Sequence, residues 1–192
     1  MRKIFSKLAS LYAILLAHFV LNSQLGGYVH DTAMSQYIPP TAFHIVTGTW
    51  TQAAGQVAGT IAMHKAATAE TAVINVPITI PSNSVALKGA YLKSVEIDYE
   101  ILIADLTSIT ISLNKVTRGT DTNVAVVSAI TVTQDITAAN AKTVEQHKVI
   151  VSITTPAWIA NTEYYLLKIS AVAPATTTID LLGAVANFTE RI

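Results

Sequence analysis

Hydrophobic and polar residues alternate through most of the chain from Phe43 onward. The clearest case is the stretch KSVEIDYEIL (93–102), in which four apolar residues alternate with three acidic ones. Successive side chains of a β-strand point to opposite faces, so this pattern predicts a strand with an apolar core face and an acidic outer face. The segment VINVPITIP (73–81) alternates in the same way, although Pro77 within it favours an edge or bulged position.

Segments of this kind follow one another along the chain, separated by short turns. We expect nine strands, at residues 43–50, 57–64, 73–81, 90–103, 107–117, 124–134, 145–155, 164–173 and 176–192, the last of them bent at Gly183. A parallel sheet would need crossover helices between its strands. No helical pattern of about ten residues follows residue 30, so an antiparallel sheet is predicted. The fold class predicted is all-β, an antiparallel, jelly-roll-like β-sandwich of about eight or nine strands with a short N-terminal helix.

The N-terminal segment, residues 1–23, has a basic start and an apolar stretch from Leu8 to Leu21. Fourteen residues are too few for a helix that spans a bilayer, which needs about 20. The length suits a signal peptide, whose contact with the membrane would be transient, but the cleavage site is poor. The alternative is a retained assembly helix with one apolar stripe, formed by Leu8, Leu11, Leu15 and Phe19.

The rest of the chain divides into two parts. Residues 24–42, which include Pro39 and Pro40, are expected to form an extended linker or arm. Residues 43–192 are expected to form the β-sandwich domain.

Composition excludes several classes of function. The chain has no cysteine, so disulfide scaffolds, thiolate metal sites and cysteine nucleophiles are ruled out. No basic stripe interleaved with aromatic residues occurs, which argues against nucleic-acid binding. Only 12% of the residues are charged, a composition that suits a subunit packed among neighbours, outside the cell or in a virion.

The three acidic residues of the clearest strand, Glu96, Asp98 and Glu100, are the most conspicuous candidates for chemistry. Neighbouring members of this ladder would lie about 6.6–6.8 Å apart on one face, a spacing that an inverting glycosidase pair could use. The same alternation arises in any half-buried antiparallel strand, so we interpret the ladder as an outer face that meets water or a neighbouring subunit.

Other candidates are aromatic or histidine side chains. Tyr28, Tyr37, Trp50 and Tyr164 could stack on sugar rings, and Trp158 is expected to plug one end of the sandwich. His44 and His64 could meet on neighbouring strands near Glu70 or Asp31, but zinc needs three or four converging ligands. We therefore predict no catalytic, cofactor-binding or metal residues, and name as possible ligand or interface residues Trp50, Tyr164, Glu96, Asp98 and Glu100.

These features favour a non-enzymatic structural subunit that assembles with copies of itself, as a trimer or polymer, into a fibre, a tail- or capsid-associated structure or a surface layer. The alternative is a secreted or displayed glycan-binding module, which would have glycans as partners. A third class, a glycoside hydrolase, would use Glu96 or Glu100.

The run FHIVTGTWTQAAGQVAGTIAMHKAATAETAVINVPITIPSNSVALKGAYLKSVEIDYEI, with the closing LLGAVANF, resembles small β-sandwich proteins of environmental phage or bacterial contigs. The resemblance extends over residues 43–190, concerns the general character of the sequence, and includes no diagnostic motif. It implies a virion- or surface-associated protein, because a role in phage heads or tails is usually suggested for such proteins.

Overall fold

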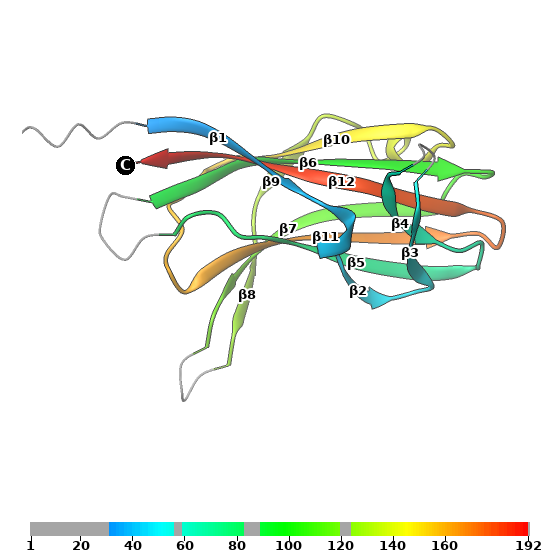
Figure 1. Cartoon of the computed structure of the whole chain (residues 1–192), viewed down its shortest axis with the longest axis horizontal. Coiled ribbons are helices and arrows are strands. Elements are labelled where there is room, and N and C mark those ends of the chain that lie inside the picture. The colour runs from blue at the N-terminus through cyan, green and yellow to red at the C-terminus, as the bar shows by residue number, and fades with distance from the viewer. Residues whose placement is uncertain (1–30, 56–58, 83–88, 120–123, 192) are drawn as a thin grey trace, which may run out of the picture. The chain divides into compact units, whose positions relative to one another are not determined.

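Two antiparallel sheets pack face to face in the computed structural model, which describes residues 31–55, 59–82, 89–119 and 124–191 (Figure 1). Apolar side chains of both sheets form one continuous core between them. The predicted antiparallel sandwich is confirmed, whereas its jelly-roll-like connectivity stays a prediction. The predicted N-terminal helix lies outside the described residues.

The larger sheet has seven strands in the order β3-β4-β12-β6-β10-β9, with β1 also paired to β12. Its strands are β1 (Asp31–Ile38), β3 (Trp50–Ala54), β4 (Ile61–Lys65), β6 (Gly89–Leu102), β9 (Val132–Gln134), β10 (Gln146–Ile153) and β12 (Thr178–Arg191). Because β6 pairs along the whole of one edge of β12, β4 and β1 share the other edge.

The smaller sheet has five strands in the order β2-β5-β11-β7-β8. They are β2 (His44–Thr47), β5 (Glu70–Ile78), β7 (Ser108–Thr117), β8 (Val126–Ala129) and β11 (Glu163–Ala173). Two short 3-10 turns, η1 (Pro40–Ala42) and η2 (Asn140–Lys142), complete the described elements.

Strand β6 shows why the sequence pattern produces this architecture. Its apolar side chains Val95, Ile97, Tyr99 and Ile101 are fully buried, and its acids point to the opposite face. Burying each large apolar side chain contributes about 1.5–3 kcal/mol, which fixes the orientation of the strand. Because β12 and β10 pair with its two edges, β6 is an interior strand of the larger sheet.

Two segments expected to be single strands are divided between the sheets. Residues 43–50 break at Gly48, whose φ of +98° ends β2 in the smaller sheet and starts β3 in the larger one. Residues 124–134 likewise divide into β8 of the smaller sheet and β9 of the larger one.

The segment 24–42, which was expected to be an extended arm, contains strand β1. No helix among the described residues is long and apolar enough to cross a membrane.

A fully buried lysine closes the sandwich where β4 turns into β5. The Lys65 ammonium donates to the carbonyl oxygens of Ala66 at 2.7 Å and Thr68 at 2.8 Å, and lies 3.5 Å from Glu70 Oε1. Glu70 in turn accepts hydrogen bonds from the backbone and hydroxyl of Thr49. This cluster ties the turn between β2 and β3 to the turn between β4 and β5.

Candidate binding groove

The acidic ladder of β6 lies on the outer face of the larger sheet, and its first member is neutralised within the chain. Glu96 forms an ion pair with Lys148 of β10 and accepts a hydrogen bond from the Asn187 amide at 2.8 Å. These two donors hold the pKa of Glu96 below its usual value. Asp98 differs, because burial raises its pKa although Lys148 lies directly across from it.

The last acid of the ladder belongs to a row of polar residues that crosses four strands. His64 of β4, Asp180 of β12, Glu100 of β6 and Gln146 of β10 are in register. His64 Nδ1 lies 2.6 Å from Asp180 Oδ1, so these two groups satisfy each other. Among the residues that the structure describes, the side chains of Glu100 and Gln146 have no hydrogen-bond or ion-pair partner, although Glu100 is half-buried.

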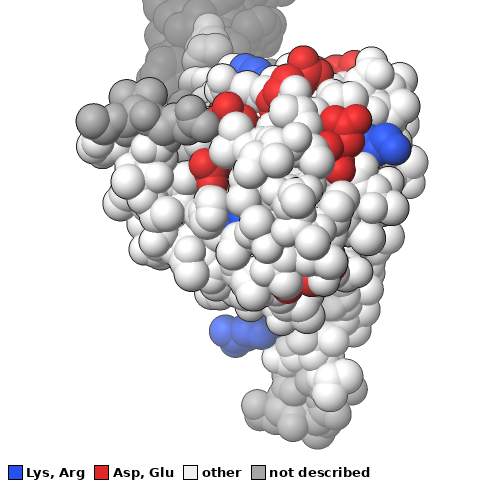
Figure 2. Space-filling view, turned by 90° about the vertical axis from the view of Figure 1, so that its right-hand side faces the viewer, with Lys and Arg blue, Asp and Glu red and all other residues white. Residues whose placement is uncertain are grey.

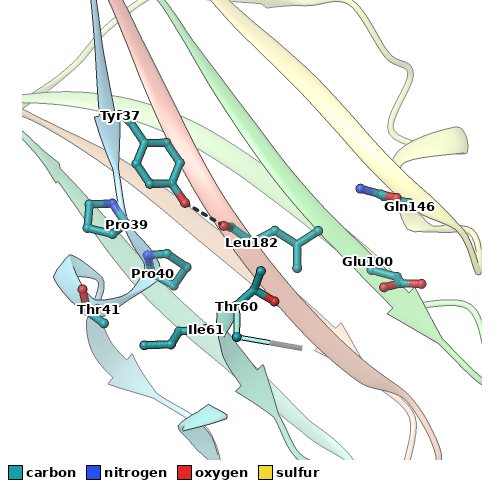
Figure 3. Close-up of a pocket in the computed structure, with 10 residues that line it drawn as sticks. Tyr37, Pro39, Pro40, Thr41, Thr60, Ile61, Glu100, Gln146 and Leu182 are labelled. Carbon is teal, nitrogen blue, oxygen red and sulfur yellow. Dashed lines mark hydrogen bonds between the residues drawn. The ribbon is translucent and has the colours of Figure 1, made fainter. Parts of the chain in front are cut away.

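A groove of about 650 Å³ opens beside these two side chains (Figure 3). One side, called here the apolar wall, is formed by Tyr37, Pro40 and Ile61, and the other by Glu100 and Gln146. Leu182 of β12 lies between the two sides. The volume falls within the range of about 300–1,000 Å³ that is typical of sites for small ligands.

Tyr37 is placed on this wall by a glycine of β12. Its hydroxyl donates to the carbonyl oxygen of Leu182 at 3.2 Å, while 60% of the residue stays exposed. A Cβ on Gly183 would lie 2.6 Å from the Tyr37 hydroxyl oxygen, so only glycine lets the ring lie this close to the strand. At the position where a bend was predicted, the pairing of β12 with β6 has a register shift between Leu181 and Gly183.

The end of the larger sheet that carries the groove is acidic. Figure 2 looks onto this end and shows Asp and Glu side chains gathered in its upper half, with few Lys and Arg among them. Glu100 and Asp180 lie opposite each other in register near this end. Asp105 comes just after β6, and Glu145 comes just before β10. Glu100, the carboxylate that lines the groove, thus has Asp180 beside it in register.

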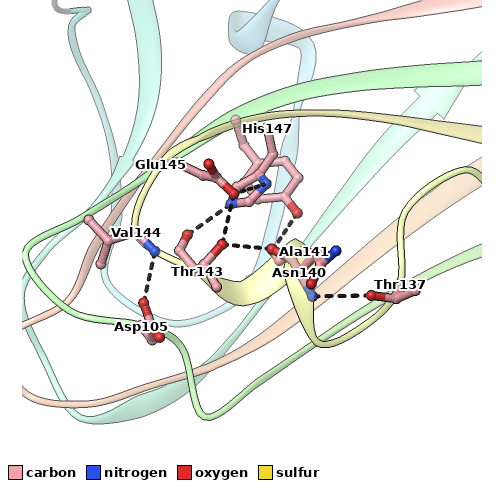
Figure 4. Close-up of polar contacts among 9 residues, drawn as sticks. Asp105, Thr137, Asn140, Ala141, Thr143, Val144, Glu145 and His147 are labelled. Carbon is pink, nitrogen blue, oxygen red and sulfur yellow. Dashed lines mark hydrogen bonds and ion pairs between the residues drawn. The ribbon is translucent and has the colours of Figure 1, made fainter.

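Glu145 and His147, which flank Gln146, take part in a network of polar contacts around η2 (Figure 4). The buried Tyr99 hydroxyl donates to the carbonyl oxygen of Ala141 at 2.6 Å, and His147 Nε2 lies 2.8 Å from that of Thr143. The rings of Tyr99 and His147 also stack at 4.9 Å. Because Gln146 precedes the buried His147, its side chain is directed to the outer face and the groove.

The aromatic residues predicted to contact ligands do not join the acids. Trp50 is only 5% exposed and points into the core, so it cannot stack on a sugar, and that expectation is corrected. Tyr164 lies on the outer face of the smaller sheet, away from Glu96, Asp98 and Glu100. Trp158 is half-buried at the surface against Tyr91 instead of plugging the core.

The suggested histidine pair is wrong as well. His44 belongs to β2 of the smaller sheet and His64 to β4 of the larger one, so the two strands are not neighbours. The acid beside His64 is Asp180 and not Glu70. Across the described ranges no group of three or more His, Asp and Glu is arranged to hold a metal ion.

Most residues of the groove escaped sequence reasoning. Tyr37 was named among possible stacking aromatics, but Pro40, Ile61, Gln146 and Leu182 were not linked to it. They come from η1, β4, β10 and β12, and no spacing in the sequence reveals that these elements meet. The one available signal was the sequence Tyr-Ile-Pro-Pro, an aromatic residue followed by a stiff segment.

Comparisons with known proteins give limited information. No protein-family model matches the chain, and no curated protein matches it. Among solved structures, it is similar to the CBM22-1 and GH10 modules of endo-1,4-β-D-xylanase 10B of Clostridium thermocellum, complexed with xylohexaose. The TM-score is 0.40 and the identity 13%, over 82% of this chain and 28% of that one.

A second similar structure is a putative sugar-binding protein of Bacteroides thetaiotaomicron. It has a TM-score of 0.39 and 12% identity, over 80% of this chain and 87% of that one. Similarity at this level does not transfer a function.

Proposed function

We propose that this protein is a non-enzymatic saccharide-binding module that holds its ligand in the groove of the larger sheet, in secreted form or displayed on a cell or virion surface. The observation that carries the proposal is the contrast between the apolar wall and the opposite side, where Glu100 and Gln146 have no side-chain partner among the described residues. Secretion or surface display is supported by the composition of the chain, in which only 12% of the residues are charged.

A pyranose ring has the same two-sided character as the groove. Its C–H groups form an apolar face, and its hydroxyl groups project from the rim as hydrogen-bond donors and acceptors. The exposed ring of Tyr37 with Pro40 and Ile61 offers a surface for the apolar face. Glu100 can accept from hydroxyl groups, and Gln146 can both accept and donate. A few convergent polar groups in a mostly apolar site are typical of small-ligand binding.

The groove is proposed to bind a saccharide without hydrolysing it. Canonical glycoside hydrolysis uses two carboxyl groups on either side of the bond that is cleaved. Glu100 is an acid on one side of the groove, whereas Tyr37, Pro40 and Ile61 supply no carboxyl group on the other. Asp180, the nearest acid in register, is already engaged by His64.

Replacing Tyr37 with alanine is expected to weaken saccharide binding by at least about tenfold, equivalent to about 1.4 kcal/mol. The stacking surface of the apolar wall is lost, while the fold is hardly affected because the side chain is largely exposed. A glycan array would identify the ligand, and isothermal titration calorimetry would compare the variant with the wild type.

Tyr164→Ala provides a matched control, since it removes a tyrosine from the outer face of the other sheet. Its affinity should equal that of the wild type. The proposal fails if no saccharide on the array binds, or if Tyr37→Ala and Tyr164→Ala bind equally well.

A second candidate function, assembly with copies of the same chain, is favoured by the edge of the smaller sheet. All four residues of β8 are exposed, including Val126 at 56% and Val127 at 64%, and β8 projects from the rest of the sandwich (Figure 1). Residues 124–134 contain no charge or proline, the devices that usually protect an edge strand. An antiparallel pair of two β8 strands would bring no like charges together.

If β8 mediates assembly, Val127→Lys should convert an oligomer into monomers, because a charge at the centre of the edge opposes strand pairing. Native mass spectrometry at several protein concentrations would measure this change. Thr154→Lys, at an exposed position after β10, should leave the oligomer intact. A wild-type chain that is monomeric at every concentration would eliminate this candidate.

A further inference from the structure

The outer face around the groove holds carboxylates that its basic groups do not fully neutralise. Lys148 is engaged by Glu96, and His64 by Asp180. Asp98 remains under-compensated, since burial raises its pKa despite the nearby ammonium of Lys148. Glu100 has no hydrogen-bond or ion-pair partner within the described ranges, and it is the carboxylate that lines the groove.

A half-buried carboxylate without a partner has lost part of its hydration and gained nothing in return. A ligand that brings a cation to it restores that loss through a charge-assisted hydrogen bond, which is about twice as strong as a neutral one. The side-chain oxygen of Gln146, on the same side of the groove, can accept a further N–H of an ammonium group. The charge of the groove thus complements a compact primary ammonium.

We propose that the groove selects an amino sugar, with its protonated amine against Glu100 and its pyranose ring on the apolar wall. This inference rests on the proposed function, because it names the class of saccharide that the same groove prefers. Anionic saccharides are disfavoured, since a uronate or sulfate would face Glu100 with Asp98 and Asp180 on the neighbouring positions of the face. Neutral sugars keep the apolar wall and the hydrogen bonds of their hydroxyl groups, but they lack the charge-assisted contact with Glu100 and bind less tightly.

Three β-1,4-linked hexasaccharides that differ only at carbon 2 provide the test: glucose, with a hydroxyl group, N-acetylglucosamine, with a neutral amide, and glucosamine, with an amine. A C6-oxidised glucose oligomer provides the anion. Calorimetric titration of the full chain at low salt should show the glucosamine oligomer binding at least about tenfold more tightly than the glucose oligomer. Added salt should reduce this preference, because part of it is a screened charge interaction.

The residue responsible is tested by Glu100→Gln, which keeps the shape and removes the charge. The ratio of glucosamine to glucose affinity should fall to about one in this variant, whatever its absolute affinities. Glu190→Gln provides a matched control, because it removes a half-buried carboxylate from the far end of β12. The ratio should be unchanged there.

The outcomes separate the inference from the proposed function. If the neutral oligomers bind and the glucosamine oligomer gains nothing, or if the anion binds as well, the amino-sugar inference falls and saccharide binding stands. If none of the oligomers binds and the glycan array is also empty, both fall. If a tri-lysine peptide competes as strongly as the glucosamine oligomer and still does so in Tyr37→Ala, the groove recognises amines and not sugars, which also overturns the inference.

Discussion

Replacing Lys65 with methionine is expected to lower the free energy of unfolding by about 3 kcal/mol, one of the two largest single-residue effects that we predict. Methionine fills the space of the aliphatic stem but donates no hydrogen bond. The carbonyl oxygens of Ala66 and Thr68 would lose a donor that is itself fully buried. Glu70 would lose the cation that lies 3.5 Å from its Oε1.

The effect can be measured by urea denaturation of the wild type, Lys65→Met, Glu70→Gln and the double variant. The two single changes should not be additive, since they remove the same contact. A Lys65→Met variant within about 0.5 kcal/mol of the wild type would contradict the prediction, because that is the ordinary effect of an exposed surface change.

Acid provides a second readout of the same cluster. Burial alone would raise the pKa of Glu70, but the hydrogen bonds from Thr49 and the ammonium of Lys65 outweigh it and hold the pKa below its usual value. Because the pKa of Glu70 is lower in the folded than in the unfolded chain, its ionisation stabilises the fold. This contribution is fully present when the pH is above the unfolded pKa of about 4.3. This stability is lost as the pH falls through the folded pKa. The difference between the wild type and Glu70→Gln should therefore shrink in acid.

Gly48→Ala is expected to cost about 3 kcal/mol as well, from a strained backbone and an overpacked contact together. The φ of Gly48 is +98°, and an added Cβ would lie 2.8 Å from the Cβ and 2.9 Å from the Cα of Ala72. Ala72 is fully buried in β5, so it has little room to move. The turn that carries the chain from the smaller sheet to the larger one would be displaced.

Gly59→Ala separates the two contributions. Its φ is +87°, but an added Cβ would meet nothing within 4 Å. Thermal or chemical denaturation should show a loss of only about 1–2 kcal/mol there, which is the cost of the left-handed conformation alone. Equal losses at the two glycines would show that the contact with Ala72 carries no cost.

Periodicity predicted the strands well, because each strand has a core face and alternation is a local property. It placed the acids of β6 on the outer face correctly, since Val95, Ile97 and Tyr99 left them no other side. It failed where one apolar segment serves both sheets. Nothing in residues 43–50 indicates that Gly48 sends the two halves to different layers.

The groove could not be predicted for a related reason. Its residues meet only because β12 has β4 and β1 on one edge and β6, followed by β10, on the other. The order of strands in a sheet is not encoded in local spacing. Trp50 illustrates the opposite error. Trp50 was expected among the aromatic residues that could stack on sugar rings, but its parity on β3 matches that of Lys65 on β4, and both point inward.

The central place of β12 has a consequence for the timing of folding during synthesis. Without this strand, the described part of the larger sheet separates into β3-β4 and β6-β10-β9, and β1 has no partner. A growing chain can form the local β3-β4 hairpin early, but the pairing of β6 with β12 spans a long stretch of sequence and must wait for the last described strand to emerge. The two sides of the groove are thus joined only when β12 has paired, so the proposed saccharide affinity would arise when the sheet is completed and not before.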